Sequence, residues 1–568
     1  MLLRRLRLPA LACAFSLLLC LCIAKPWVGM GTNDDPSYAR SAELLAQTGH
    51  VVYNGWSAPI LGWHLFLGAL FIKLFGFSFD VLRLSTVLVA MVMAFVAQRA
   101  MVRFGLTEWN ATLATLTLIL SPIFLPLSFS YMTDIGGLAV LVLCWYGCLR
   151  AVQSRDDTRG ALWILCAVLV GAVGGTSRQT GWLGVFIIVP CTLWIVRKRR
   201  KVVLAGLVAI VLSSVGILEV MRWFARQPHV VGTGGAAGIY NHGLLILVRS
   251  LGVNMFELPL LVLPVLLPFI PLIHLRNRRA RVTFVVCVVM SAVIVAWILT
   301  RQDPGFWLLP SGISYFTAHG IMDSTIIHGH RPVIFPFAVR VVLTLLALAG
   351  TVGLLTYLAE QYRPVRWGQI GRSSKETWVL LVPLAAVYLC LLLPRAYMAM
   401  MFDRYLLPLL FVVLIVVVRA FQGPTRRRLP VYSFALVLVI GGLTVALTHD
   451  AFSMMRARLQ AVRNVMTAGV PDSRIDGGWE YNLWTQLVQV GYVPPDLGGR
   501  SNQAVCRPQM YRYTPAVKPE YALSFDPTDC NGPSEFPAVT YREWVGPRNV
   551  TIYVVKSGPA TNNMARSR

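Results

Sequence analysis

The chain has 568 residues, of which 56% are hydrophobic and only 13% charged, and its mean hydropathy is +0.64. This composition is that of a polytopic membrane protein and excludes an ordinary soluble domain. The net charge of +26 does not indicate nucleic-acid binding, because the basic residues form short clusters between apolar segments.

The N-terminal part combines an apolar segment, residues 8–28, with an acidic pair. No small-x-small cleavage site separates the two, so we expect a retained signal anchor. The pair, Asp34 and Asp35, stands in Gly31-Thr-Asn-Asp-Asp-Pro-Ser-Tyr-Ala-Arg40 of a chain with only 25 acidic residues. Adjacent carboxylates repel each other when both are ionised, and they suit proton abstraction, metal binding or capture of a polar substrate. The alternative is that they cap a helix beginning near Pro36.

Thirteen apolar segments have the length of membrane spans. They lie near residues 8–28, 84–104, 111–130, 135–152, 160–177, 182–196, 202–224, 246–273, 282–300, 333–358, 377–394, 405–421 and 430–448. A further apolar stretch, 59–77, would put the Arg197–Lys201 cluster outside if it crossed the membrane, against the positive-inside rule. We therefore expect 59–77 to form an interfacial or re-entrant helix in the first outer loop, a position that Trp56 and Trp63 suit.

Charge then orients the whole chain. With a cytoplasmic N-terminus, the basic clusters are all cytoplasmic: Arg99 and Arg103, Arg150 to Arg159, Arg197 to Lys201, Arg276 to Arg281, Arg363 to Lys375, and Arg426 to Arg428. The sequence thus predicts a multi-pass protein of the plasma (inner) membrane whose C-terminal region is extracytoplasmic. Its outer side carries Asp34, Asp35, Asp134, Arg178, Arg331 and Arg404.

The composition changes near residue 449, where charged, Pro, Gly and Asn residues become frequent. We expect a membrane domain over 1–448 and a small extracytoplasmic domain over 449–568. Thr551-Ile-Tyr-Val-Val-Lys reads as a late β-strand, which makes mixed α/β structure the expectation there. Cys506 and Cys530 are the cysteines that fall in this polar region, and they could form a disulfide.

Carboxylates and arginines at one membrane face suit a substrate with a hydroxyl group and a lipid-borne phosphate. A carboxylate can accept the hydroxyl proton, and arginine can hold phosphate oxygens and stabilise a departing anion. Each residue also has a structural alternative. Asp134 could cap the helix that begins at Ile135, Arg178 could be an interfacial snorkelling residue, and Arg404 could pair with Asp403 at the surface.

Five segments carry a resemblance to a known family. They are Asn33-Asp-Asp-Pro-Ser-Tyr-Ala39, Phe75-Gly-Phe-Ser-Phe-Asp-Val-Leu-Arg83, Ser121-Pro-Ile-Phe with Tyr131-Met-Thr-Asp-Ile135, and Arg404-Tyr-Leu-Leu-Pro408. In their order and spacing, over about residues 10–420, the chain resembles the GT-C glycosyltransferases, specifically the multispan group of protein O-mannosyltransferases and the aminoarabinose transferase of lipid A. The resemblance implies an all-α membrane domain of about thirteen spans, with interfacial helices in the first outer loop.

The resemblance also implies an activity, namely inverting transfer of a sugar from a polyprenyl-phosphate donor to a hydroxyl group at the outer face. Asp34 would be the general base, Asp35 would shape the loop or share polar contacts, and Asp134 would line the same cavity. Arg178 and Arg404 would bind the lipid phosphate. Where some relatives have an acidic–basic pair this chain has Ser57-Ala58, so His64 or Arg331 would replace the missing basic residue.

Other interpretations remain open at this point. A transporter or flippase of lipid-linked glycans would use the same charges without bond cleavage, although it predicts repeated halves and polar residues near mid-span. An O-antigen ligase or polymerase would rest on outer arginines and histidines. His319, His328 and His330 lack the tight ligand spacing of a zinc site. A divalent metal is possible but no pattern supports it, and the sugar and the acceptor (lipid, glycan or protein) are not specified.

Overall fold

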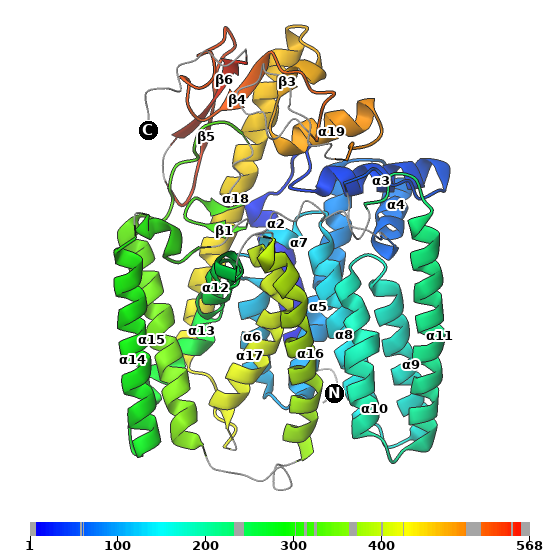
Figure 1. Ribbon diagram of the computed structural model, residues 1–568, viewed down its shortest axis with the longest axis vertical. Coiled ribbons are helices and arrows are strands. Elements are labelled where there is room, and N and C mark those ends of the chain that lie inside the picture. Colours follow the sequence, from blue (N-terminus) through cyan, green and yellow to red (C-terminus); the bar gives the residue numbers. More distant parts are fainter. Residues whose placement is uncertain are drawn as a thin grey trace.

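The computed structural model describes residues 7–56, 60, 62–231, 244–301, 303–311, 315–322, 327–362, 372–398, 401–423, 425–495, 513–546 and 549–557. It is a mostly helical bundle with a small β-sheet region near the C-terminus (Figure 1). This confirms the predicted fold class of a multispan helical part followed by a small mixed α/β part.

The bundle consists of apolar helices, most of them long and a few of only one or two turns. They are α2 (Leu8–Ala24), α5 (Phe79–Arg103), α6 (Glu108–Ile119), α7 (Phe124–Ser128), α8 (Thr133–Gln153), α9 (Asp157–Gly174), α10 (Val189–Ile195), α11 (Arg200–Ala225), α12 (Leu244–Leu261), α13 (Leu263–Leu266), α14 (Arg278–Leu299), α15 (Phe337–Gln361), α16 (Arg372–Tyr397), α17 (Leu407–Gln422) and α18 (Val431–Thr467). Shorter 3-10 or π turns, η1 (Gln179–Trp182), η2 (Gly184–Ile188), η3 (Leu267–Leu272), η4 (Pro304–Trp307), η6 (Asp403–Leu406) and η7 (Asp472–Arg474), connect or extend them.

Ten of the thirteen predicted spans correspond to helices of sufficient length and apolarity. Within the described residues, nine single helices qualify, and a tenth candidate is the pair formed by α12 with α13 and η3, bent by 65°. The other three segments form shorter elements: α2, the broken pair α6 and α7, and the irregular run Gln179–Ile195. Ser121-Pro122 separates α6 from α7, as expected where proline removes a backbone donor. Whether these three cross the membrane stays a prediction.

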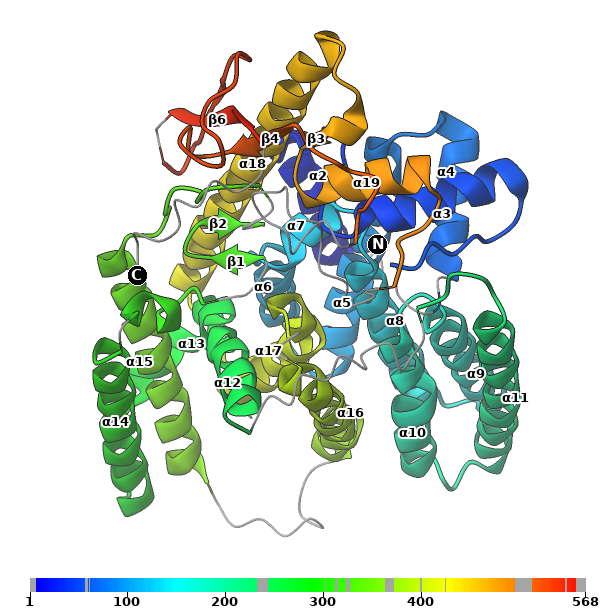
Figure 2. The same ribbon diagram turned by 45° about the horizontal axis from the view of Figure 1, so that its top comes forward.

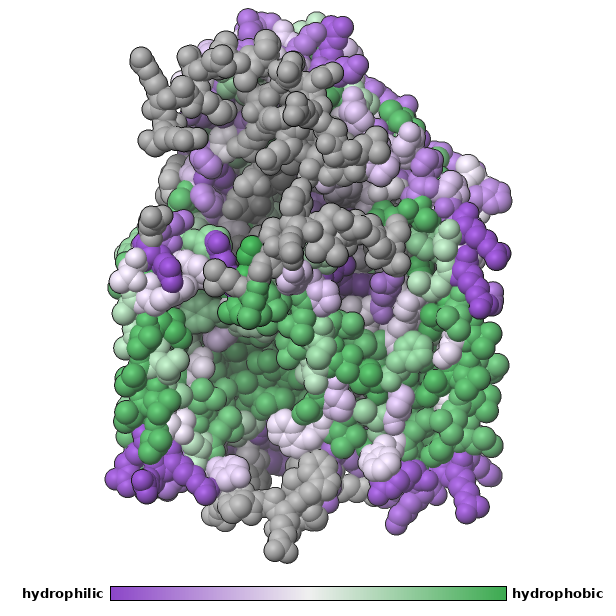
Figure 3. Space-filling model, in the orientation of Figure 1, coloured by the Kyte–Doolittle hydropathy of each residue, from purple (hydrophilic) through white to green (hydrophobic). Residues whose placement is uncertain are grey.

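On the face seen in Figure 3, a green apolar band crosses the bundle and hydrophilic residues gather below it. The loops with the basic clusters before α11, before α14 and between α17 and α18 lie at this lower end in Figure 1. Among the candidate spans, α8 and α17 are the most enclosed: 83% and 78% of the residues in their apolar stretches are buried, compared with 6% for α14. Side chains at the upper ends of these two helices therefore face other parts of the protein.

The upper end carries two short helices. α3 (Asp35–Thr48) lies across the bundle, and α4 (Trp63–Phe75) packs against it (Figures 1 and 2). α4 falls inside the stretch 59–77 that we predicted to be interfacial, and at 13 residues it is shorter than a span. α3 begins at the acidic pair and ends at Gly49, whose φ of +75° is the left-handed conformation that glycine adopts readily.

The C-terminal region sits above the same end. Helix α18, 37 residues long, continues through residues 448 and 449 without a break, so the predicted domain boundary falls inside a helix. Four strands follow in the order β3-β4-β6-β5, namely β3 (Ile475–Asp476), β4 (Tyr521–Ser524), β6 (Asn549–Lys556) and β5 (Val539–Arg542). β6 confirms the predicted late strand. Helix α19 (Trp479–Gln489) connects β3 to the rest. Cys530 is disulfide-bonded, and Cys506 lies outside the described residues.

One further hairpin, β1 (Phe316–Thr317) with β2 (Gly320–Ile321), belongs to the predicted outer loop 301–332. Residue His328 of this loop pairs with Ser524 of β4 in an isolated bridge, and its Nε2 lies 3.0 Å from Asp476 Oδ2. The predicted histidine-rich loop is thus attached to the C-terminal sheet.

Candidate active site

The acidic pair forms a tight turn before α3. Asn33 has φ +53°, and the Asp35 N–H donates to Thr32 O at 3.0 Å. The buried Asp35 carboxylate accepts three hydrogen bonds, from Thr32 N–H (3.0 Å), Thr32 O–H (2.8 Å) and Tyr131 N–H (3.0 Å). Burial raises the pKa of Asp35 to about 6, although Arg83 and these hydrogen bonds act in the opposite direction. Asp35 therefore holds the turn against the start of α8.

Asp34 is the more accessible member of the pair. It occupies the N-cap position of α3, but its side chain caps no backbone N–H. Instead Oδ1 accepts the indole N–H of Trp56 at 2.9 Å, and Oδ2 lies 3.6 Å from Nη2 of Arg404. Its side chain keeps 20% of its surface exposed, whereas that of Asp134 keeps 1%. Asp34 can thus meet a substrate hydroxyl.

Arg404 lies in η6, directly before the enclosed helix α17. The alternative of a surface bridge to Asp403 does not hold, since the buried Asp403 carboxylate accepts the backbone N–H groups of Tyr315, Phe316 and Arg404. The Arg404 guanidinium turns toward Asp34 instead. Its Nε and Nη1 are buried and have no hydrogen-bond partner within the described part of the chain. Unsatisfied guanidinium donors beside a carboxylate form a ready site for an anionic oxygen.

A second carboxylate–arginine pair lies nearby. Arg178 Nη2 is 2.8 Å from Asp134 Oδ1, and Arg178 Nη1 donates to Thr133 O–H at 3.3 Å. Asp134 belongs to the first turn of α8, and Arg178 follows the end of α9. A Cβ atom on Gly137 would lie 2.5 Å from Arg178 Cδ, so the absence of a side chain lets the arginine cross α8 here. Arg178 is therefore held inside the protein by an ion pair.

Aromatic rings join the two pairs into one site. The guanidinium groups of Arg178 and Arg404 lie 5.4 and 5.5 Å from the centroid of the Tyr405 ring. Burial and then the Asp34 carboxylate raise the pKa of Tyr38 on α3, and Arg404, Asp134 and Arg178 are close enough to act on the same phenol. The structure therefore brings together Asp34, Asp134, Arg178 and Arg404 from four separate parts of the chain.

Sequence reasoning missed several members of this site. Arg395, an exposed residue of α16, lies 5.4 Å from the Tyr405 ring and adds a third guanidinium. Tyr38, Tyr405 and the indole of Trp56 also went unassigned. Tyr405 follows Arg404 in the quoted motif, and this adjacency was the one available signal. The contacts of the others depend on packing between distant segments.

Two predicted phosphate-binding residues have other surroundings. His64 is buried against Tyr131, with ring centroids 4.0 Å apart, and burial lowers its pKa to about 3, which favours the neutral ring. Arg331 forms a buried ion pair with Glu543 at 3.2 Å, close to the C-terminal sheet. Neither supplies a free positive charge to the pair of Asp34 and Arg404. Ser57 and Ala58 lie outside the described residues.

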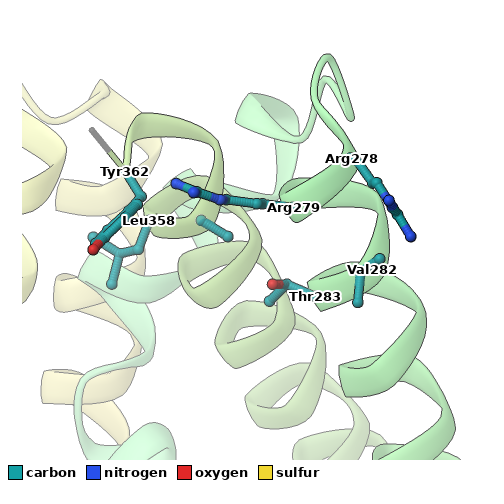
Figure 4. A pocket seen from close by; sticks show the side chains of 7 residues that line it. Arg278, Arg279, Val282, Thr283, Leu358 and Tyr362 are labelled. Carbon is teal, nitrogen blue, oxygen red and sulfur yellow. The ribbon is translucent and has the colours of Figure 1, made fainter. Parts of the chain in front are cut away.

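Other possible sites are poorer. Among the residues that the structure describes, no group of three or more His, Cys, Asp or Glu side chains could hold a metal ion. A cavity of about 660 Å³ lies at the opposite, lower end of α14 and α15. Figure 4 shows Arg279 reaching toward Tyr362 in this cavity while Arg278 points away. Among the described residues, no carboxylate lines it, so the described lining offers no carboxylate that could accept a proton.

Comparison with known sequences covers part of the chain and begins after Asp34 and Asp35. Residues 58–218 match the family described as dolichyl-phosphate-mannose-protein mannosyltransferase. The chain resembles these membrane glycosyltransferases. The match includes Asp134 and Arg178, and it ends before Arg404. No curated protein matches the sequence of this chain.

Solved structures with some similarity come from three kinds of organism. ArnT from Cupriavidus metallidurans, bound to undecaprenyl phosphate, is 15% identical with a TM-score of 0.41, and the match covers 94% of this chain and 96% of that one. An oligosaccharyltransferase from Archaeoglobus fulgidus is 14% identical with a TM-score of 0.42, over 82% and 58%. The S. cerevisiae protein O-mannosyltransferase Pmt1-Pmt2 complex, bound to the sugar donor, is 13% identical with a TM-score of 0.32, over 40% and 35%. This chain thus spans about a third of the yeast chain.

Proposed function

We propose that the protein is an inverting glycosyltransferase that moves a sugar from a polyprenyl-phosphate donor to a hydroxyl acceptor at the extracytoplasmic face of the membrane. The observation that carries the proposal is the buried Arg404, whose Nε and Nη1 have no hydrogen-bond partner in the described structure while Nη2 faces the accessible Asp34. Transfer from a phosphate leaving group requires a base and an anion-binding group, and both thus occur in one site.

In the proposed reaction, the acceptor hydroxyl gives its proton to Asp34 while its oxygen attacks the anomeric carbon. The bond from that carbon to the phosphate oxygen breaks, and polyprenyl phosphate departs with the electron pair. Arg404 would hold the phosphate oxygens, with Arg178 and Arg395 adding positive charge around Tyr405. Asp34 is preferred over its acidic neighbours because its side chain keeps 20% of its surface exposed, whereas Asp35, Asp134 and Asp403 are buried.

Two further observations support this assignment. The family matched by residues 58–218 is named for a dolichyl-phosphate sugar, a lipid-borne phosphate donor. The site lies at the end of the bundle opposite the basic loops, which the positive-inside rule assigns to the cytoplasm. The proposal needs no cofactor beyond the donor and leaves the sugar and the acceptor unspecified.

Transfer from defined polyprenyl-phosphate sugars by the purified protein tests the proposal. We expect Asp34→Asn to fold but to lose at least about a hundredfold in rate, the scale of lost general-base catalysis. Asp156→Asn is the matched control, because Asp156 caps α9 at the basic end of the bundle and asparagine caps equally well. Full activity of Asp34→Asn would remove Asp34 from the mechanism. Movement of an intact lipid-linked sugar without bond cleavage would favour a flippase instead.

A further inference from the structure

The turn that holds Asp34 is contacted from above by the C-terminal region. Helix α19 lies over α3 in both ribbon views (Figures 1 and 2) and packs against it. The Asn33 N–H donates to Oε1 of Glu480, in the first turn of α19, at 3.0 Å. The other oxygen of Glu480 accepts from Arg458 of α18 at 3.1 Å, and both side chains of this pair are nearly inaccessible to solvent. The buried Glu480 carboxylate, paired with Arg458, thus holds the backbone of Asn33, the residue before Asp34.

Trp479, the residue before Glu480 in α19, contacts the Trp56 ring, which hydrogen-bonds to the Asp34 carboxylate. The ring of Trp479 packs on that of Trp56 with centroids 4.6 Å apart, and Tyr513 flanks Trp56 at 5.1 Å. Trp56 in turn donates its indole N–H to Asp34 Oδ1 at 2.9 Å. Two consecutive residues, Trp479 and Glu480, therefore act on two different neighbours of Asp34.

Backbone contacts fix the segment that carries Trp56. The Val493 N–H, just beyond α19, donates to Asn54 O at 2.8 Å. A Cβ atom on Gly55 would lie 2.4 Å from Val493 O, and Gly55 has φ +79°, so this position accepts only glycine without a shift. The close approach of the two chain segments is therefore built into the sequence.

We propose that α19 is a positioning element that completes the candidate active site. Glu480 fixes Asn33 and Trp479 fixes Trp56, so that the Asp34 carboxylate stays aimed at Arg404 and at the acceptor. The assignment of Asp34 as the base rests on the proposed function, whereas the clamp itself rests on the contacts above. A misplacement of about 1 Å at a reacting group lowers rate strongly, which is why the turn is held from two sides. The positive charge of Arg458 balances the buried Glu480 carboxylate, which would be costly to bury without a partner.

Transfer kinetics of two Glu480 variants test the role of the clamp. Glu480→Ala removes the acceptor for Asn33, and we expect kcat to fall at least about tenfold with KM for the donor unchanged. Glu480→Gln keeps a carbonyl oxygen for Asn33 but turns an amide N–H toward Arg458, so its kcat should lie between those of Glu480→Ala and the wild type. Glu520→Ala is the control, since Glu520 forms an exposed ion pair with Arg474 in the same region. A kcat of Glu480→Ala equal to that of the control, or a change in KM alone, overturns the positioning role.

Hydrogen exchange of the Asn33 amide gives a readout that does not depend on activity. In full-length protein we expect faster exchange in Glu480→Ala than in wild type, a smaller increase in Glu480→Gln, and no change in Glu520→Ala. Unchanged exchange in Glu480→Ala overturns the clamp, whatever the enzyme does. If exchange is faster in Glu480→Ala but the wild-type protein transfers no sugar from any donor tested, the proposed function is rejected and the clamp is retained.

Discussion

Asp34 and Asp35 are adjacent in sequence but differ in what surrounds them. Asp35 accepts three hydrogen bonds from Thr32 and Tyr131, so an asparagine there would turn an amide N–H toward an N–H donor. We expect Asp35→Asn to lower the free energy of unfolding by about 1–3 kcal/mol, the cost of an unsatisfied buried group. Asp34→Asn should leave it nearly unchanged. Thermal unfolding of both variants in detergent checks this, and equal midpoints would contradict it.

The sequence could indicate which charges meet but not how each is held. Asp34, Asp134, Arg178 and Arg404 were selected because charge-based topology put them near span ends on one side. The pairing of Arg404 with Asp34 rather than Asp403 depends on a hairpin loop whose backbone N–H groups occupy Asp403. The burial of Arg331 against Glu543 likewise depends on packing between segments that are 212 residues apart in the sequence. No local pattern carries that information.

At the scale of elements, the loop before α4 and the end of α19 must approach closely. An alanine at Gly55 would place its Cβ 2.4 Å from Val493 O, whereas Gly49 has nearly the same φ, +75°, and nothing within 4 Å. Both variants bear the strain of a left-handed alanine, about 1–2 kcal/mol. We expect Gly55→Ala alone to displace Trp56 and to reduce transfer at least about tenfold. Equal activities of Gly55→Ala and Gly49→Ala would show that the contact with Val493 is not needed.

Apolar length located the elements well where helices are regular. It failed to indicate the irregular run after Arg178, where 3-10 and π turns follow each other through Gln179–Ile188. The chain packs so closely here that a side chain at some glycine positions would not fit: a Cβ on Gly175 would lie 1.9 Å from the Trp182 ring. Hydropathy also could not show that α18 leaves the apolar band as one continuous helix, because a helix can change its surroundings without changing its backbone.

At the scale of the whole molecule, the two ends of the bundle differ in the residues that gather there. Basic loops gather at the lower end, while the candidate site and the sheet lie at the other (Figures 1 and 3). The positive-inside rule counts such short loops strongly, so the predicted orientation rests on lysine and arginine alone. Since every donor phosphate and acceptor must then be reached from the outer side, the orientation is also a condition of the proposed reaction.

Labelling of single introduced cysteines in intact cells tests this orientation. We expect a membrane-impermeant thiol reagent to modify Glu520→Cys, near the sheet, without lysis, and to modify Arg428→Cys, in the exposed α17–α18 loop, only after lysis. The exposed native cysteines, Cys22, Cys166 and Cys390, lie on the apolar helices α2, α9 and α16, so mass spectrometry can separate them from the introduced sites. The reverse labelling pattern would place the site of Asp34 and Arg404 in the cytoplasm and would reject extracytoplasmic transfer.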